Sequence, residues 1–315
     1  MELSVNQELI VQQMNIKISN NNFVFESISC LCGKNTFDLI ASVERYGIEQ
    51  QTVVCKNCGL IQLNPRMSYS DYTEFYESDI YRKLYEPDGI ESCTSLYSNK
   101  TGQHIFDKIN SNFNITNNQK VLEIGSGGGW NLIPFYNNNM DVLGLDYSKG
   151  LVQMGREYGL NMIQGGLEKL DGTFDIIIIN HVLEHFTNPL ENVKKIIEHL
   201  NDAGILYIAV PNILNFSILQ IQNAHIYYFT PNLLKYYLSR IGLECVDFGP
   251  EENIHMSGIF RVNNSLSNDI TLTHCKNEVY KMFKKQYFKY DILRPLLVKS
   301  KLLNPIKNIK NLFVH

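Results

Sequence analysis

The amino-acid sequence predicts an α/β fold: a Rossmann-like, doubly wound, mostly parallel sheet of seven strands. Two observations favour it. Apolar segments of strand length recur from residue 120 onward and alternate with segments of helical periodicity. The first of these strands runs into a turn with three glycines, and a helix can begin directly after the turn. A cysteine-bearing segment precedes the sheet and a basic segment follows it, so we also expect a small N-terminal subdomain and a helical C-terminal extension.

Several predicted elements have recognisable ends. Ser148 can cap a helix that stops at Gly159, because serine accepts a hydrogen bond at a helix start and glycine tolerates the terminal turn. A second helix is expected from Thr230 to Gly242, and a third over residues 131–136, with a proline in its first turns. Strands are expected at 120–124, 141–145, 161–164, 174–179 and 204–210.

Composition limits the classes of function. The chain has 315 residues, enough for two domains, and its 28 Lys and Arg against 32 Asp and Glu give a net charge of −4. No global basic field exists to attract a nucleic acid, so we expect no nucleic-acid partner. No run of eighteen apolar residues and no signal-peptide pattern occurs, and seven cysteines fit a reducing compartment. These features predict a cytoplasmic protein.

The glycine turn indicates what kind of ligand binds beside it. Glycines stand at 125, 127 and 129, and Trp130 occupies the place where a dinucleotide-binding turn has its last glycine. Glu123 lies two residues before the first glycine, and Asp146 ends the next strand. A carboxylate at Glu123 would repel a pyrophosphate but suits a cationic amino-acid ligand, while Asp146 lies where an acid binds ribose hydroxyls. A nicotinamide-type site and a glycine loop that only forms a turn remain alternatives.

This pattern resembles the class I S-adenosylmethionine-dependent methyltransferases over roughly residues 100 to 262. The resemblance implies that S-adenosylmethionine is the cofactor, with its methionine part at Glu123 and the glycines and its ribose at Asp146. After the third strand, the position where the family often has an acid for the adenine is Gly166. The resemblance therefore implies this cofactor-binding set: Glu123, Gly125, Gly127, Gly129, Asp146, Tyr147, Gly165, Leu167, Asn180 and His181.

The acceptor side is expected in two histidine-bearing segments. Asn180 to Phe186 follows the most apolar strand and resembles a family segment, so His181 is a candidate for contact with cofactor or acceptor and for proton removal. His185 is interpreted as a structural partner that holds this loop, with Glu184 as its pair. His225 is the second catalytic candidate, although plain packing remains an alternative for it.

The neighbours of His225 bear on the reaction type. In the sugar C-methylating members of the family, a tyrosine and a glutamate precede the corresponding histidine, whereas this chain has Gln222 and Ala224 there. The resemblance therefore favours O-methylation, for which one base is sufficient, over C-methylation.

Four cysteines have the spacing of a metal-binding ribbon. Cys30 and Cys32 form one pair, and Cys55 and Cys58 form a second pair twenty-two residues further along. Four thiolates on two turns can surround a structural zinc ion and leave no coordination position open for catalysis. The first pair is tighter than the usual C-x-x-C, which leaves open whether Cys30 is a ligand, and free thiols in a small β subdomain are the alternative.

The residues after the second pair, Cys58 to Arg66, are similar to those of zinc-ribbon methyltransferases that modify sugars for antibiotics and bacterial surface polysaccharides. The resemblance implies a sugar or sugar nucleotide as acceptor. An RNA or other small-molecule methyltransferase, a sugar C-methyltransferase and a non-catalytic S-adenosylmethionine-binding scaffold are the alternatives. The predicted domains are the zinc ribbon at 1–68, a tyrosine-rich linker or lid at 69–100, the methyltransferase domain at 101–264 and a basic helical tail at 265–315.

The basic tail has two interpretations. Its helices either pack on the protein, including a second subunit of a homodimer, or lie at an anionic membrane surface, where basic and bulky apolar residues are commonly used.

Overall fold

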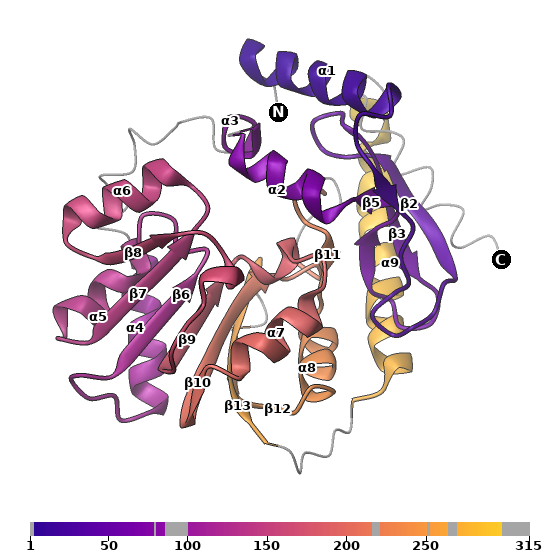
Figure 1. Cartoon of the computed structure of the whole chain (residues 1–315). Coiled ribbons are helices and arrows are strands. Elements are labelled where there is room, and N and C mark those ends of the chain that lie inside the picture. The colour runs from indigo at the N-terminus through magenta and orange to yellow at the C-terminus, as the bar shows by residue number, and fades with distance from the viewer. Residues whose placement is uncertain are drawn as a thin grey trace.

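The computed structural model describes residues 3–78, 80–85, 100–215, 221–250, 253–263 and 270–297. A large sheet with helices on both faces and a smaller sheet, flanked by the long helix α9, form its two halves (Figure 1). The large sheet has seven strands in the order β12-β13-β10-β9-β6-β7-β8, and β13 alone runs antiparallel to its neighbours. This confirms the predicted fold class. The strands are β6 Lys120–Ile124, β7 Asp141–Asp146, β8 Asn161–Gln164, β9 Phe174–Asn180, β10 Leu200–Pro211, β12 Leu243–Phe248 and β13 His255–Val262.

The two-residue period of the strands divides the core into two layers. On β9, Ile176 and Ile178 belong to one buried cluster, whereas Ile177 and Ile179 belong to the other. The first cluster includes residues of three helices: α4 Lys100–Asn112, α5 Ile133–Asn137 and α6 Lys149–Tyr158. The second includes residues of α7 Pro189–Ile197 and α8 Pro231–Ser239. A strand buried on both faces explains the uninterrupted apolar run from which it was predicted.

Helix ends largely follow the predicted signals. The Ser148 side chain accepts from Leu151 N at the start of α6, and Gly159 ends the helix at a φ of +103°. Thr230 caps α8 in the same way, but that helix ends at Ser239, earlier than predicted. The predicted helix at 131–136 begins instead as a 3-10 turn, η2 Trp130–Leu132, and becomes α-helical only in α5. Strand β10 starts at Leu200, four residues before the predicted start; a register shift against β9 lies between Leu200 and Ile205, and its first four residues are not buried.

The small sheet combines segments that are distant in sequence. Its order is β11-β4-β3-β2, and β11 Tyr227–Tyr228 comes from the loop that carries His225. The other strands are β2 Phe37–Val43, β3 Glu49–Cys55 and β4 Ile61–Leu63, with a separate pair of β1 Phe25–Glu26 and β5 Arg66–Met67. The N-terminal subdomain is therefore joined by backbone hydrogen bonds to the segment that follows the fifth strand of the large sheet.

Four helices surround this subdomain. Helix α1 Val5–Ser19 lies at its end, and the tyrosine-rich segment forms α2 Tyr69–Glu77 and α3 Ile80–Tyr85 between the two sheets (Figure 1). Helix α9 Leu272–Leu297 runs along the small sheet and buries apolar residues of its first turns, namely Cys275, Val279, Met282 and Phe283. The first turns of the predicted tail thus pack on the protein, while residues 298–315 lie outside the described ranges. Among the described helices, none combines the length and apolar character that a membrane span requires.

Candidate functional site

The carboxyl ends of β6, β7, β8 and β9 form one edge of the large sheet, where ligands of such sheets bind. The structure brings the predicted cofactor residues to this edge. Gly127 N donates to Asp146 Oδ2 over 2.8 Å, and Gly165 N donates to Asp146 O over 2.9 Å. Asn180 and His181 stand at the end of the neighbouring strand β9. Hydrogen bonds therefore join the turns after β6 and β8 to the end of β7, and β9 ends beside β6 in the sheet.

The three glycines of the turn after β6 have a backbone that other residues avoid. Gly125, Gly127 and Gly129 have φ values of +66°, +57° and +79°. Their neighbours also exclude a side chain: a Cβ on Gly125 would lie 2.4 Å from Val182 Cγ2, and one on Gly127 would lie 2.5 Å from Trp130 Cη2. Only glycines therefore fit this turn, whose backbone packs closely against Val182 and Trp130.

Glu123 is buried beneath this turn, with 1% of its surface exposed. Its Oε1 accepts from Asn131 Nδ2 over 2.8 Å, whereas Oε2 has no hydrogen-bond partner in the described part of the chain. Burial raises the pKa of Glu123 to about 8, although the hydrogen bond from Asn131 lowers this pKa in part. A buried carboxyl oxygen without a partner beside a glycine turn fits a cationic ligand, which would favour the charged form of the carboxyl. Asn131 was not among the predicted site residues.

Asp146 contacts the tyrosine-rich segment as well as the glycine turn. Its Oδ1 accepts from Ser148 N over 2.8 Å and lies 3.7 Å from Nη2 of Arg82 in α3. The sequence analysis missed Arg82, because nothing local to residue 82 indicates that α3 reaches the second strand. Arg82 therefore brings α3 to the carboxylate that was expected to bind the ribose.

Glu168 places a carboxylate beside Gly166. Its Oε1 accepts from Gly166 N over 2.8 Å, and Tyr147 Oη donates to its Oε2 over 3.3 Å. Glu168 is the middle residue of the 3-10 turn η3 Leu167–Lys169, directly after Leu167. Its side chain thus folds back onto the turn after β8, beside Gly165. Sequence analysis missed Glu168, although an acid two residues from the expected position was the available signal.

His181 and Glu184 form a pair at the end of β9. His181 has a φ of +56°, rare for a residue with a side chain, and its Nδ1 lies 3.3 Å from Glu184 Oε1. The His181 side chain is 34% exposed and that of Glu184 only 1%. Burial would raise the pKa of Glu184, but the hydrogen bond to His181 and the nearby histidines lower it to about 2. The expected pairing of Glu184 with His185 is thus replaced by pairing with His181.

His185 and His225 lie on the buried side of this pair. His185 Nδ1 lies 2.9 Å from the carbonyl oxygen of Ala224 and 2.8 Å from Tyr76 Oη, so His185 does hold the loop, as predicted. His225 Nε2 lies 4.0 Å from Glu184 Oε1. Burial lowers the pKa of both His185 and His225, which keeps their imidazoles neutral.

Another histidine, which sequence analysis did not select, contacts His181 on its other side. The ring centroids of His181 and His255 are 4.6 Å apart, and His255 begins strand β13. Burial lowers the pKa of His255 as well.

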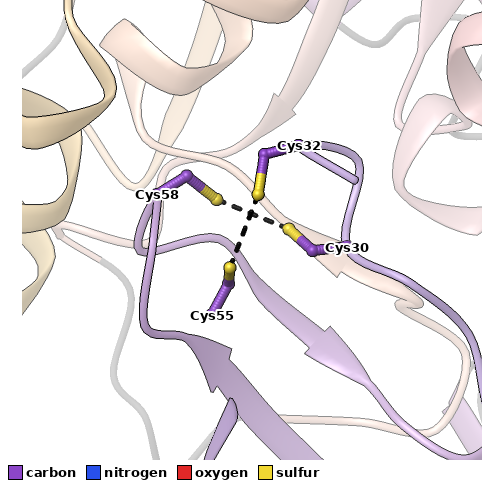
Figure 2. A group of neighbouring side chains, drawn as sticks. All are labelled: Cys30, Cys32, Cys55 and Cys58. Carbon is purple, nitrogen blue, oxygen red and sulfur yellow. Dashed lines mark hydrogen bonds between the residues drawn. The ribbon is translucent and has the colours of Figure 1, made fainter. Parts of the chain in front are cut away.

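The four predicted cysteines meet between two loops, with their sulfurs directed at one another (Figure 2). Cys30 Sγ lies 3.4 Å from Cys58 Sγ, Cys32 Sγ lies 3.6 Å from Cys55 Sγ, and all four lie within 4.8 Å of one another. A tetrahedral zinc ion with Zn–S bonds of about 2.3 Å requires sulfurs about 3.8 Å apart. The donor set therefore fits zinc, and Cys30 is positioned like the other three.

Polar groups also surround the cysteine sulfurs. Leu60 N and Tyr237 Oη donate to Cys58 Sγ over 3.4 and 3.2 Å, and Asn57 Nδ2 donates to Cys32 Sγ over 3.5 Å. Such donors stabilise thiolates, the form that binds a metal.

Comparisons with known proteins agree with this geometry. Residues 97–247, just under half of the chain, match the family model described as a methyltransferase domain. The ubiquinone biosynthesis O-methyltransferase of Rickettsia prowazekii (strain Madrid E) is 28% identical over 118 residues, which cover 35% of this chain and 47% of that protein. The protein of the same name from Rickettsia typhi is 25% identical over 118 residues, which cover 35% of this chain and 48% of that protein. The chain thus spans about half the length of the curated relatives it matches.

A crystal structure shows the same fold over a longer part of the chain. That structure is the Burkholderia thailandensis 1,6-didemethyltoxoflavin-N1-methyltransferase with bound 1,6-didemethyltoxoflavin and S-adenosylhomocysteine. It is 15% identical, with a TM-score of 0.50, over 69% of this chain and 96% of that chain.

Proposed function

Because residues 97–247 form a class I S-adenosylmethionine-dependent methyltransferase domain, we propose that the protein transfers the methyl group of S-adenosylmethionine to a hydroxyl oxygen. The observation that carries this proposal is the His181–Glu184 pair at the end of β9, beside the glycine turn. It places an oriented, partly exposed imidazole at the sheet edge assigned to the cofactor.

S-adenosylmethionine supplies the activated methyl group. Glu123 binds the cationic amino-acid part through its buried carboxylate, and Asp146 and Glu168 offer carboxylates for the ribose and the adenine amino group. The three glycines allow the close approach of the ligand to the backbone. His181 accepts the proton of the acceptor hydroxyl, and Glu184 holds the imidazole by its Nδ1, leaving Nε2 for the acceptor.

We further propose that the acceptor is a sugar or sugar nucleotide for a bacterial surface glycan or a related secondary metabolite. Its support is the resemblance of the cysteine ribbon and the following residues to sugar-modifying methyltransferases. Ala224 and Gln222 leave His225 without the acid and phenol of the C-methylating members, which favours oxygen as the methylated atom. The ribbon is proposed to hold one structural zinc ion through Cys30, Cys32, Cys55 and Cys58.

The test is acceptor-dependent release of S-adenosylhomocysteine by the full chain over a panel of sugar nucleotides. We expect product heavier by one methylene, and a fall in kcat of about 100-fold or more for His181→Gln. The affinity for S-adenosylmethionine should change by only a few fold, because the imidazole acts on the acceptor. His104→Gln, at an exposed position of α4, is the control and should keep wild-type kcat.

Other outcomes would contradict the proposal. Thermal stabilisation by S-adenosylmethionine without release of S-adenosylhomocysteine over the whole panel would indicate a binding scaffold. Wild-type kcat in His181→Gln would remove His181 from the chemistry and move the search for a base to His225 and His255.

A further inference from the structure

Glu184 of the His181–Glu184 pair and two neighbouring histidines offer metal-ligand atoms to one point; Glu184 and His225 are buried and His185 is half-buried. They are Glu184 and His185 of the short turn η4 Leu183–His185, together with His225 of the loop before β11. One ligand atom from each lies within 4.8 Å of the others. Glu184 is 1% exposed and His225 is 8% exposed, so water has little access to this cluster.

Two polar atoms of the cluster lack partners. Glu184 uses Oε1 for His181, but Oε2 has no hydrogen-bond partner among the described residues. The same holds for His225 Nδ1 within the described ranges. Burying a polar atom without a partner is costly, and a carboxylate oxygen costs most. The cluster therefore has the binding capacity for a further positively charged group.

The backbone keeps the cluster in a fixed arrangement. His185 Nδ1 lies 2.9 Å from the carbonyl oxygen of Ala224 and 2.8 Å from Tyr76 Oη. A carbonyl oxygen only accepts, so this contact favours the tautomer with the proton on Nδ1 and a lone pair on Nε2. Metal-binding histidines commonly donate their other N–H to a carbonyl in this way. Ile226 N donates to Glu184 O over 2.8 Å, so the loop that carries His225 is bonded directly to the turn that carries the other two.

We propose that Glu184, His185 and His225 form a second metal site, distinct from the four cysteines, for a divalent first-row transition ion. Two imidazoles and one carboxylate suit such ions, whereas four thiolates select zinc. Glu184 would bind the ion through Oε2 while Oε1 keeps His181 in place. For its effect on catalysis the inference rests on the proposed function, since the ion would fix the carboxylate that orients the base. Metal binding itself does not depend on turnover.

Cobalt distinguishes the two sites. The full-length, metal-free chain, reduced and titrated with Co²⁺, should bind two equivalents. One should give the intense near-ultraviolet band of thiolate-to-metal charge transfer, and the other only weak visible d–d bands. In protein loaded with a single equivalent of zinc, which the four thiolates bind first, Mn²⁺ should bind one equivalent per chain by electron paramagnetic resonance, because manganese prefers oxygen and nitrogen ligands to thiolates.

Variants of each group of ligands show which site binds which metal equivalent. Glu184→Gln and His225→Gln should each weaken Mn²⁺ binding at least 100-fold and remove the cobalt equivalent without charge transfer, while the thiolate band remains. Cys55→Ser should lose the thiolate band and keep Mn²⁺ binding. The control His104→Gln should keep both the thiolate band and Mn²⁺ binding. Far-ultraviolet circular dichroism of each metal-free variant establishes that it folds.

The proposal is overturned if protein loaded with a single equivalent of zinc binds no Mn²⁺, or if Mn²⁺ binding is unchanged in both Glu184→Gln and His225→Gln. A chain that binds two metals but never releases S-adenosylhomocysteine would refute the proposed function and leave the metal site standing. A chain that releases S-adenosylhomocysteine but binds a single metal equivalent would refute the second metal site and leave the proposed function standing.

Discussion

At the scale of single residues, the site depends on carboxyl groups in unequal environments. Glu123 and Glu184 are equally buried, yet burial raises the pKa of Glu123 to about 8, while His181 and its neighbours bring that of Glu184 down to about 2. Glu123 has only an amide for a partner, whereas Glu184 lies among imidazoles. The pKa values therefore favour the neutral form of Glu123 and the charged form of Glu184, which contacts His181 Nδ1.

The first prediction concerns Glu123→Gln. Because a cationic ligand favours the carboxylate, binding of S-adenosylmethionine at pH 7 should release a proton from Glu123. The variant should show no such release and should bind about 10- to 100-fold more weakly, the worth of a hydrogen bond to a charged group. Calorimetry in buffers of different ionisation enthalpy measures both. Glu44→Gln, a buried glutamate of the N-terminal subdomain, should bind like wild type; equal proton release by Glu123→Gln would contradict the prediction.

At the scale of elements, glycines determine how closely the loops approach their neighbours. Gly127 and Gly172 both have positive φ, +57° and +79°, but only Gly127 has a neighbour where a Cβ would stand. Gly59 and Gly33 form a second such pair, each directly after the second cysteine of its loop, with φ values of +83° and +77°. A Cβ on Gly59 would lie 2.9 Å from Lys276 Cα of α9, whereas one on Gly33 would meet nothing within 4 Å.

The second prediction compares Gly127→Ala with Gly172→Ala. Both carry the same cost of a left-handed backbone, about 1 kcal/mol, but the first also pushes against the Trp130 ring. Gly127→Ala should weaken S-adenosylmethionine binding more than tenfold, and Gly172→Ala should leave it unchanged. Equal dissociation constants for the two variants would show that the glycine turn is not the binding cradle.

The third prediction compares Gly59→Ala with Gly33→Ala. The extra methyl on Gly59 must displace the backbone of α9, so this variant should lose about 1 to 3 kcal/mol more free energy of unfolding than its partner. Urea unfolding in excess zinc measures the difference. If the two variants unfold alike, α9 does not rest on the second cysteine loop in solution.

At the scale of the whole molecule, polar contacts connect the cysteine subdomain to the catalytic loops. Glu44, in the turn between β2 and β3, accepts from Tyr46 N, Ile48 N and Tyr85 Oη. Tyr85 Oη in turn accepts from Asn223 N, two residues before His225. Together with the β4–β11 pairing, these bonds make the position of His225 depend on the N-terminal subdomain.

The fourth prediction concerns the pH dependence of stability. Burial raises the pKa of Glu44 from 4.5 to about 7, so the folded protein binds this proton more tightly than the unfolded chain. Stability from this group is fully present below pH 4.5 and is lost as the pH rises to about 7, by a total on the order of 3 kcal/mol. In zinc-containing buffer, the free energy of unfolding of Glu44→Gln should lack this pH-dependent loss between pH 4.5 and about 7. The exposed Glu49→Gln should follow wild type, and a wild-type slope in Glu44→Gln would contradict the prediction.

Much of the fold could be predicted because its signals are local. Neighbouring residues were sufficient to predict β9 from its apolar run, the start of α6 from Ser148 and the tight turn from its three glycines. The spacing of two cysteine pairs was likewise sufficient to predict that the four cysteines meet. The last two strands, β12 and β13, were counted in the predicted seven-stranded sheet but were not located in the sequence, because β13 pairs with β10, far away in the sequence. The site was predicted as a set of residues at strand ends, and their roles remain proposals.

The sequence by itself determined the five strands β6 to β10, the position of the glycine turn and the segments that reach the sheet edge, because backbone conformation and side-chain period are local properties. Tertiary structure alone decided the partnerships. Glu184 pairs with His181 rather than His185, Glu168 folds back to Gly166, and Arg82 reaches Asp146. Helix α9 likewise covers the cysteine loop beside Gly59. These contacts arise when separate elements pack, and rotamer, distance and burial are fixed only once the whole chain has folded.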